Sequence, residues 1–322
     1  MALTLPAHGG DLAAAEARWG RPAEGWLDLS TGINPWPYPL PPLPAEAWTR
    51  LPGTAEVERL CAAAARAFAA PGPDWVLPGP GSSALIQWLP RITPRARVAV
   101  VGPTYAEHAA AWRAAGHEVR EACSLAEAAG AEVTVVVNPN NPDGRIVPPA
   151  ELAGLPGMVV VDEAFGEVMP EASAVPLLRP GMVVLRSFGK FHGLAGLRLG
   201  FAVAAPATLA PLAAALGPWA VSGPALAVGA VALADHAWAT ATRAHLSSMA
   251  DRLDVVLCAG GLEVVGGTSL FRLARAEAAA EIHDRLGRAG VLVRAFADRP
   301  ALLRFGLPAG EKDLERLRAA LR

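Results

Sequence analysis

The chain has few cysteines and little imbalance of charge. Only three cysteines occur in 322 residues, at Cys61, Cys123 and Cys258, and none belongs to a Cys-x-x-Cys pair. Scattered cysteines of this kind act as small buried hydrophobes in a reducing compartment, which argues against a disulfide framework and against a metal site. The 28 lysines and arginines nearly balance the 30 aspartates and glutamates, so the composition does not indicate a nucleic-acid partner.

Signals for export and for membrane insertion are also missing. Residues 1–11 have neither a basic region nor an apolar core, so we expect no signal peptide and a cytoplasmic location. Residues 199–234 carry no charge and are long enough to span a bilayer. Frequent prolines interrupt that segment, however, and most of its apolar residues are alanine, which is only weakly lipophilic. We therefore expect it to form buried core and a joining helix, with no membrane partner.

Apolar runs of strand length alternate with helical patterns in the middle of the chain. The runs cover residues 75–77, 98–101, 133–137, 158–161 and 182–185. Helical patterns at 83–89 and 107–115 occupy two of the gaps. Strands that are apolar on both faces and separated by helices indicate a mostly parallel sheet covered on two sides. In such a sheet, ligands bind at the carboxyl ends of the strands.

The two ends of the chain differ from this pattern. Residues 1–45 include a proline-rich run, and we expect them to form an arm that packs on a smaller domain and on the active site. Residues 46–215 are expected to form the large domain, with a first helix at about 55–69. Residues 216–322 are expected to form a joining helix and a small α+β domain. The elements predicted for that small domain are strands at 262–265, 269–273, 291–294 and 302–305, and a helix at 278–286.

The densest group of reactive side chains follows the run at 182–185. It is a glycine-rich loop that contains Ser187, Lys190 and Arg198. A lysine becomes a nucleophile when its surroundings lower its pKa, and a Schiff base with an aldehyde cofactor is the usual use. The Ser187 hydroxyl and the Arg198 guanidinium are suited to bind a phosphate dianion. This stretch alone leaves open the alternative of a surface loop with two solvated cations.

Polar residues follow four other predicted strands. Gly81, Ser82 and Ser83 begin the helical pattern at 83–89, where free N–H groups form either an anion site or an ordinary helix cap. Tyr105 follows the run at 98–101 and is suited either to stacking on a planar ring or to half-buried core packing.

The last two strand ends are equally ambiguous when taken alone. Asn141 lies in a run of turn-forming residues after 133–137 that is consistent with a simple loop. Asp162 ends the buried run at 158–161, and a carboxylate there needs a partner because its desolvation alone is costly.

A family resemblance gives these strand ends a common interpretation. The stretch from Ser187 to Phe201 reads S-F-G-K-x-x-G-L-A-G-L-R-L-G-F, and it resembles the cofactor-lysine motif of fold-type-I pyridoxal-phosphate enzymes in the class I/II aminotransferase superfamily. The other strand ends occur in the superfamily's order, so the resemblance covers almost the whole chain. It implies an α/β fold of the PLP-dependent transferase type I. That fold has a large domain, with a mostly parallel sheet between helices, and a smaller α+β domain.

The resemblance implies pyridoxal 5'-phosphate as cofactor and assigns residues by position. Lys190 would carry the Schiff base, and Asp162 would keep the cofactor's ring nitrogen protonated, which draws electrons from the bond broken at Cα. The remaining cofactor ligands would be Gly81, Ser82, Ser83, Ser187 and Arg198 for the phosphate, Tyr105 for stacking, and Asn141 for the phenolic oxygen.

The resemblance also implies ligands for a substrate. Arg304 matches the superfamily arginine that holds the α-carboxylate. Arg294 matches one that binds a substrate phosphate in the histidinol-phosphate aminotransferase branch. His8 and Asn34, on the expected arm, are weaker candidates to cover the same site. For both arginines, an ordinary position at the surface end of a strand remains the alternative.

Within the superfamily, the chain most resembles the threonine-phosphate decarboxylases of cobalamin synthesis. It has H-G-G from His8, D-x-S-x-x-I-N-P from Asp28, and D-E-A-F from Asp162. The aminotransferase branch usually has tyrosine in place of Phe165. Relatives also commonly have tyrosine in place of Leu51, and the hydroxyl of that tyrosine contacts the cofactor phosphate of the neighbouring subunit. Leucine cannot make this contact, so it is not expected here.

This branch implies a homodimer that acts on a small phosphorylated amino acid. The expected reaction is decarboxylation of L-threonine O-3-phosphate to (R)-1-aminopropan-2-ol O-phosphate. The enzymatic alternative is a histidinol-phosphate-type aminotransferase, which uses the same residues but breaks the Cα–H bond. A non-catalytic regulator with this fold is the other alternative, and it would normally need an attached DNA-binding domain, for which the sequence before the proline-rich run has no room.

Overall fold

The chain divides into two compact units. The structure, a computed structural model, describes residues 9–322. Residues 37–241 form one unit, and residues 9–36 together with 242–322 form the other. The long helix α10 (His236–Ala259) begins in the first unit and ends in the second. The domain limits expected from the sequence, at 45/46 and 215/216, stay a prediction.

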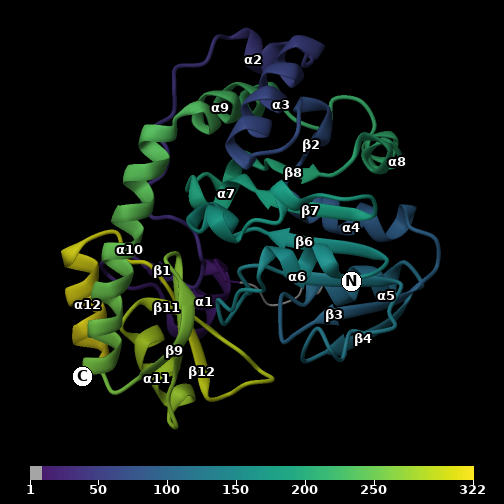
Figure 1. Cartoon of the computed structure of the whole chain (residues 1–322). Helices are drawn as coiled ribbons and strands as arrows, with labels where there is room; N and C mark the ends of the chain where they lie inside the picture. The colour runs from purple at the N-terminus through teal and green to yellow at the C-terminus, as the bar shows by residue number, and fades with distance from the viewer. Residues whose placement is uncertain (1–8) are drawn as a thin grey trace. The chain divides into compact units, whose positions relative to one another are not determined.

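The unit of residues 37–241 is built on a seven-stranded sheet in the order β2-β8-β7-β6-β5-β3-β4 (Figure 1). Its strands are β2 (Val76–Gly79), β3 (Arg97–Val101), β4 (Glu118–Ala122), β5 (Val133–Val137), β6 (Met158–Glu163), β7 (Met182–Ser187) and β8 (Gly200–Val203). Strands β3 to β7 pair in parallel, whereas β8 is antiparallel to both of its neighbours, β2 and β7. The predicted mostly parallel sheet is confirmed.

Helices cover both faces of this sheet. They are α2 (Glu46–Thr49), α3 (Thr54–Phe68), α4 (Ser82–Ile92), α5 (Glu107–Ala114), α6 (Pro149–Gly154), α7 (Phe188–Phe191), α8 (Pro206–Leu216) and α9 (Gly223–Ala234), with short 3-10 turns η1 (Pro73–Trp75), η2 (Gly166–Val168), η3 (Pro170–Ala172), η4 (Val175–Leu177) and η5 (Ala195–Leu197). Alternate side chains of β7 enter opposite cores. Val183 packs in a cluster with α4, α5 and α8, and Val184 packs in one with α3 and α9. This alternation explains why the strands are apolar on both faces.

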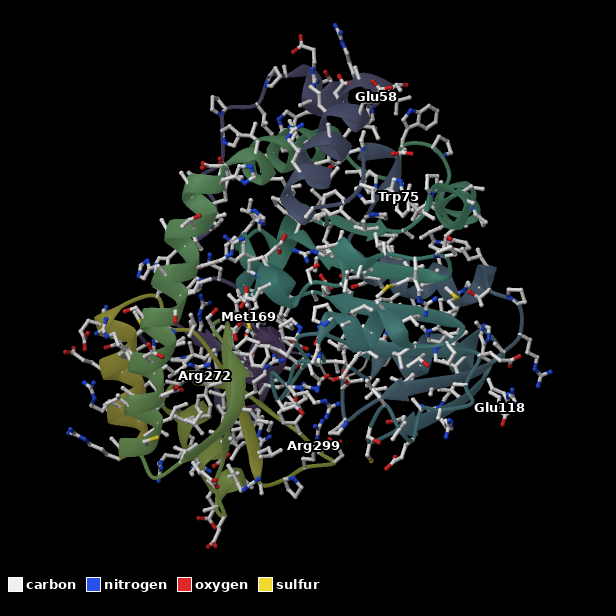
Figure 2. The ribbon with its side chains drawn as sticks, viewed as in Figure 1. Glu58, Trp75, Glu118, Met169, Arg272 and Arg299 are labelled. Atoms are coloured by element: carbon white, nitrogen blue, oxygen red, sulfur yellow. The ribbon has the colours of Figure 1, made fainter. Side chains whose placement is uncertain are left out.

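The second unit contains a smaller sheet in the order β1-β11-β12-β10-β9. Its strands are β1 (Leu27–Leu29), β9 (Glu263–Thr268), β10 (Phe271–Arg275), β11 (Val291–Ala295) and β12 (Leu302–Gly306), and its helices are α1 (Leu12–Trp19), α11 (Ala279–Arg288), α12 (Glu311–Leu321) and the second part of α10. Arg272 on β10, labelled in Figure 2, forms an ion pair of 2.8 Å with Asp254 of α10. The expected α+β character of this part is confirmed.

The uncharged segment from residue 199 to 234 forms β8, α8 and α9. Both helices contribute buried leucines to the cores of the first unit. Within residues 9–322, no helix is both long and apolar enough to cross a membrane.

Candidate active site

Three strands bring the glycine-rich segments of the sequence to one edge of the large sheet. In the strand register, Gly79 at the end of β2 and Ser187 at the end of β7 both lie opposite Gly200, the first residue of β8. A Cβ atom on Gly200 would collide with the backbone nitrogen of Ser82. Glycine at this position therefore lets β8 pass directly against the start of α4.

The start of α4 and Arg198 together form an anion-binding corner. Gly81 precedes the helix with a φ of 85°, and among residues 9–322 no side chain caps this helix N-terminus. A Cβ atom on Gly81 would stand 2.6 Å from Nη2 of Arg198, so the guanidinium lies directly beside the turn. Unsatisfied N–H groups, the positive end of the helix dipole and a guanidinium are the ligands that a phosphate dianion prefers.

A buried carboxylate lies at the carboxyl end of β6. Asp162 is 3% exposed, and its Oδ2 lies 2.8 Å from Nε2 of His108, a residue of α5 that is 1% exposed. Its Oδ1 accepts a hydrogen bond from the Ala164 backbone N–H at 2.9 Å. The sequence reasoning missed His108. The signal available was a histidine three residues after Tyr105 in a predicted helix, but its partner is 54 positions away in the chain.

Tyr105 lies in the loop after β3, half-buried, with its ring edge-on to His108 at a centroid distance of 6.1 Å. The pKa of Tyr105 is raised to about 12, chiefly by burial and also by the charges of Glu107 and Asp162, with Arg198 opposing them. The phenol is therefore neutral at physiological pH. Tyr105 is within the electrostatic range of both Asp162 and Arg198, which were predicted to bind the same cofactor.

The loop after β5 is fixed to the Tyr105 loop by side-chain hydrogen bonds. Asn140 accepts a bond of 2.6 Å from the Thr104 hydroxyl and donates one of 3.0 Å to the carbonyl of Pro103. Arg145 donates to the carbonyl of Gly102 at 2.9 Å. Asn141, the predicted ligand, is the half-buried residue next to Asn140. Its loop is thereby held against the segment that carries the stacking tyrosine.

Lys190 lies on α7, immediately after β7. Its Nζ is 6.0 Å from the ring centroid of Phe165, which follows the end of β6. Because β6 and β7 are adjacent parallel strands, the Lys190 amine and Asp162 belong to the same edge of the sheet. A lysine, a buried carboxylate, an aromatic ring and an anion corner are thus all found at the strand ends of this unit.

The two predicted substrate arginines lie in the other unit, where they are direct cross-strand partners on β11 and β12. Arg304 is buried, and it donates a hydrogen bond of 2.8 Å to the carbonyl of Ser30. The pKa of Arg304 is lowered to about 10, chiefly by burial and also by the charge of Arg294, with Asp28 opposing them. Two neighbouring guanidinium groups that remain charged at neutral pH form a site for anions.

Arg294 is more exposed than Arg304, and burial lowers its pKa, with Asp298 opposing that shift. Its guanidinium lies 5.7 Å from the ring centroid of Phe296, and that of Arg299, labelled in Figure 2, lies 4.8 Å from the same ring. Asn34 is buried, and its Oδ1 accepts a bond of 2.9 Å from the backbone of Trp36. His8 lies outside the described residues.

The sequence profile of the family "Aminotransferase class I and II" matches residues 48–321. The chain belongs to this family. Over 98% of its length it is 47% identical to the threonine-phosphate decarboxylase of Pseudomonas aeruginosa, of which 96% is covered. It is 44% identical to the threonine-phosphate decarboxylase of a Sinorhizobium species, over 98% of this chain and 97% of that relative.

The fold agrees with this family. The crystal structure of histidinol-phosphate aminotransferase from Sinorhizobium meliloti, in complex with pyridoxal-5'-phosphate, matches with a TM-score of 0.81 and 23% identity, covering 99% of this chain and 94% of that one. At this identity the likeness concerns the fold. The predicted fold type and the predicted superfamily are both confirmed.

As a member of the class I and II aminotransferases, the chain has a sheet edge that fits pyridoxal phosphate. The turn at Gly81 leaves room for an anion beside Arg198, because a Cβ there would fill the corner. The carboxylate of Asp162, buried and oriented by His108, suits a protonated ring nitrogen. The family, this donor set and Lys190 agree on pyridoxal 5'-phosphate as the cofactor.

Proposed function

We propose that this protein is a pyridoxal-phosphate-dependent decarboxylase of L-threonine O-3-phosphate. The observation that carries the proposal is the near full-length identity of 47% to a threonine-phosphate decarboxylase. The residues proposed as cofactor ligands lie at the strand ends of the large sheet, which supports it. The cross-strand arginines support a substrate with two anionic groups. The proposed product is (R)-1-aminopropan-2-ol O-phosphate, and cobalamin synthesis is its expected destination.

Residues of the large sheet would hold the cofactor. The phosphate ligands are Gly81, Ser82, Ser83, Ser187 and Arg198, and the ring and oxygen ligands are Tyr105 and Asn141. Bound pyridoxal phosphate supplies an electron sink that stabilises the charge left at the substrate's Cα when a bond to that carbon breaks. Lys190 provides the amine that attaches to the cofactor aldehyde.

Asp162 has a defined task in this chemistry. Its burial and its contacts with His108 and the Ala164 N–H fix the carboxylate in one orientation. A fixed, ionised carboxylate holds a proton on the ring nitrogen, and the resulting positive charge strengthens the electron sink. His108, on α5, orients the carboxylate of Asp162 and would act on the cofactor only through it.

The substrate loses its carboxylate and gains a proton. The Cα–carboxylate bond breaks, carbon dioxide leaves, and a proton is delivered to Cα; Lys190 is the residue we assign to that delivery. Arg304 is assigned to the α-carboxylate and Arg294 to the side-chain phosphate. Arg304 is the more buried of the two, which suits a group that every amino-acid substrate shares. Asn34 is a weaker candidate to assist them.

The proposed enzyme is a homodimer of the cytoplasm. Large apolar side chains are exposed near the start of α3 and in the loop after α8: Leu51 is 68% exposed and Trp219 is 59% exposed. A cavity of about 320 Å³ beside them is lined by Pro52, Val57 and Trp219, among others. An apolar surface of this kind supports association with a second copy. The three cysteines form no disulfide, which is consistent with a reducing compartment.

The test uses purified protein with added pyridoxal phosphate and L-threonine O-3-phosphate, with and without 2-oxoglutarate. The proposal predicts release of carbon dioxide in both reactions at the same rate. A histidinol-phosphate-type aminotransferase would instead require the 2-oxo acid and would form glutamate without carbon dioxide. Turnover of histidinol phosphate that depends on 2-oxoglutarate would favour that alternative.

A further inference from the structure

The helix that carries Lys190 is too short to be stable by itself. Helix α7 contains only four residues, Phe188–Phe191. Isolated helices shorter than about 12 residues are marginal in water, so tertiary contacts must fix this turn. Phe188 and Phe191 are fully buried, and a Cβ atom on Gly189 would stand 2.6 Å from the Cα of Ala195. The position of the Lys190 amine therefore depends on what packs against α7.

A histidine at the end of α7 stacks on two aromatic rings. His192 directly follows the helix and is buried. Its imidazole stacks on the ring of Phe188, at a centroid distance of 4.1 Å and an interplanar angle of 7°. It also stacks on the ring of Trp238, at 5.5 Å and 10°. Trp238 belongs to α10, and its ring also meets that of Phe191 on α7 edge-on at 5.5 Å. The first turn of α10 therefore contacts the lysine helix both directly and through the imidazole.

Tyr38 completes the packing from a third segment. Its backbone N–H donates to the carbonyl of His192 at 2.8 Å, and its phenol donates to Oδ2 of Asp235 at 3.2 Å. The other oxygen of Asp235 accepts from the backbone N–H of Trp238 at 2.9 Å. The rings of Tyr38 and Trp238 meet edge-on at 5.0 Å. Tyr38, His192, Asp235 and Trp238 thus form one connected group, which we call the Lys190 clamp.

We infer that the Lys190 clamp positions the catalytic lysine. Its members act through α7, which they hold in one place so that the amine reaches the cofactor aldehyde and the substrate's Cα. They are positioning residues, and the inference rests on the proposed role of Lys190. A displacement of about 1 Å at a reacting group can cost about a hundredfold in rate, so loosening α7 should have a large kinetic effect.

The test compares Trp238→Leu with Trp238→Phe in the full-length protein. Leucine removes the aromatic face that His192 packs against, whereas phenylalanine retains one. The measurement is the rate at which cofactor-free protein captures pyridoxal phosphate, followed by absorbance and by borohydride trapping with mass spectrometry of the Lys190 peptide. We expect Trp238→Leu to lower the capture rate and kcat by about tenfold or more, with KM for L-threonine O-3-phosphate changed by less than about twofold.

Two comparisons separate positioning from a general loss of stability. Trp238→Phe should restore most of the capture rate. Phe68→Leu removes a buried aromatic ring that packs edge-on against Phe201 in the same unit, and it should leave the capture rate unchanged. If Trp238→Leu fails to fold, Tyr38→Phe replaces it, because that change removes only the hydrogen bond to Asp235. We expect Tyr38→Phe to slow capture by roughly threefold, in keeping with one lost hydrogen bond.

The outcomes distinguish this inference from the proposed function. Capture at the parental rate in Trp238→Leu, or in Tyr38→Phe where that variant is used, overturns the clamp and leaves the role of Lys190 intact. Equal slowing in Phe68→Leu also overturns it, since the effect would then be general. Absence of any trapped Lys190 peptide in the parental protein overturns the proposed function and the clamp together.

Discussion

The buried carboxylate of Asp162 is stabilised by two specific contacts. A carboxylate that is removed from water needs compensating contacts, and here one oxygen faces His108 while the other accepts an N–H bond. The family resemblance assigned Asp162 to the cofactor's ring nitrogen, and its place at the end of a buried strand indicated only that the carboxylate needs a partner. The sequence did not predict His108, because the pairing joins α5 to β6 and depends on the packing of a helix on the sheet.

Replacing Asp162 with asparagine should reduce turnover more than cofactor retention. The substitution keeps the size of the side chain but removes the charge that holds a proton on the ring nitrogen, whereas the phosphate ligands remain. A charge-assisted hydrogen bond contributes about 1.5–3 kcal/mol, which corresponds to roughly a tenfold to hundredfold loss in kcat. Steady-state kinetics and a cofactor dissociation constant are the measurements, with the exposed Asp74→Asn as control. Turnover within about twofold of the parent would contradict the role.

The paired arginines should separate by the substrate group that each one binds. When one partner of a buried pair of opposite charges is truncated, here the arginine that faces a substrate anion, the loss of binding free energy is about 2–5 kcal/mol. Arg304→Ala should therefore weaken the binding of L-threonine and of L-threonine O-3-phosphate by similar factors, since both compounds have an α-carboxylate. Arg294→Ala should weaken the binding of the phosphorylated compound alone. Competitive inhibition constants for the two compounds provide the measurement. An equal penalty on both from Arg294→Ala would show that this arginine does not bind the phosphate.

Whole elements were predicted well where hydrophobic runs were long, and missed where they were short or charged. The run at 133–137 coincides with β5, and the helix expected at 55–69 is α3, Thr54–Phe68. Strand β4 was missed because it is an edge strand with three charged residues among its five, Glu118, Arg120 and Glu121. Strand β8 was missed because it has only four residues, the first two of which belong to the lysine motif. Strand β8 runs antiparallel to β2 and β7, which places Arg198 beside α4. This direction depends on pairing between distant segments, so it cannot be predicted from the local sequence.

The turn into α4 gives a test at the level of this element. Gly81→Ala should weaken cofactor binding, because the new Cβ would meet Arg198 and the left-handed φ of 85° disfavours alanine. Gly116→Ala is the matched control: Gly116 has a φ of 88° and no neighbour within 4 Å of the added carbon. Both variants should lose about 1–2 kcal/mol of unfolding free energy from backbone strain. Only Gly81→Ala should also raise the cofactor dissociation constant, measured by equilibrium dialysis; equal constants for the two would contradict the anion corner.

At the scale of the whole molecule, the two ends of the chain combine into one unit. Residues 9–36 contribute β1, which pairs in parallel with β11 of the C-terminal part. The sequence indicated an arm but not its strand, because Leu27–Leu29 is only three residues long and its partner is far along the chain. The proposed cofactor ligands all lie within residues 37–241, and the proposed substrate arginines lie within residues 242–322.

The most direct test of the account is the fate of the substrate's Cα in deuterium oxide. Purified protein, pyridoxal phosphate and L-threonine O-3-phosphate are incubated without any 2-oxo acid, and the products are analysed by mass spectrometry and NMR. The account predicts carbon dioxide and 1-aminopropan-2-ol phosphate in equal amounts, with a single deuterium on the carbon that lost the carboxylate. Recovery of intact L-threonine O-3-phosphate with deuterium at Cα and no carbon dioxide would contradict it, since the enzyme would then break the Cα–H bond as an aminotransferase does.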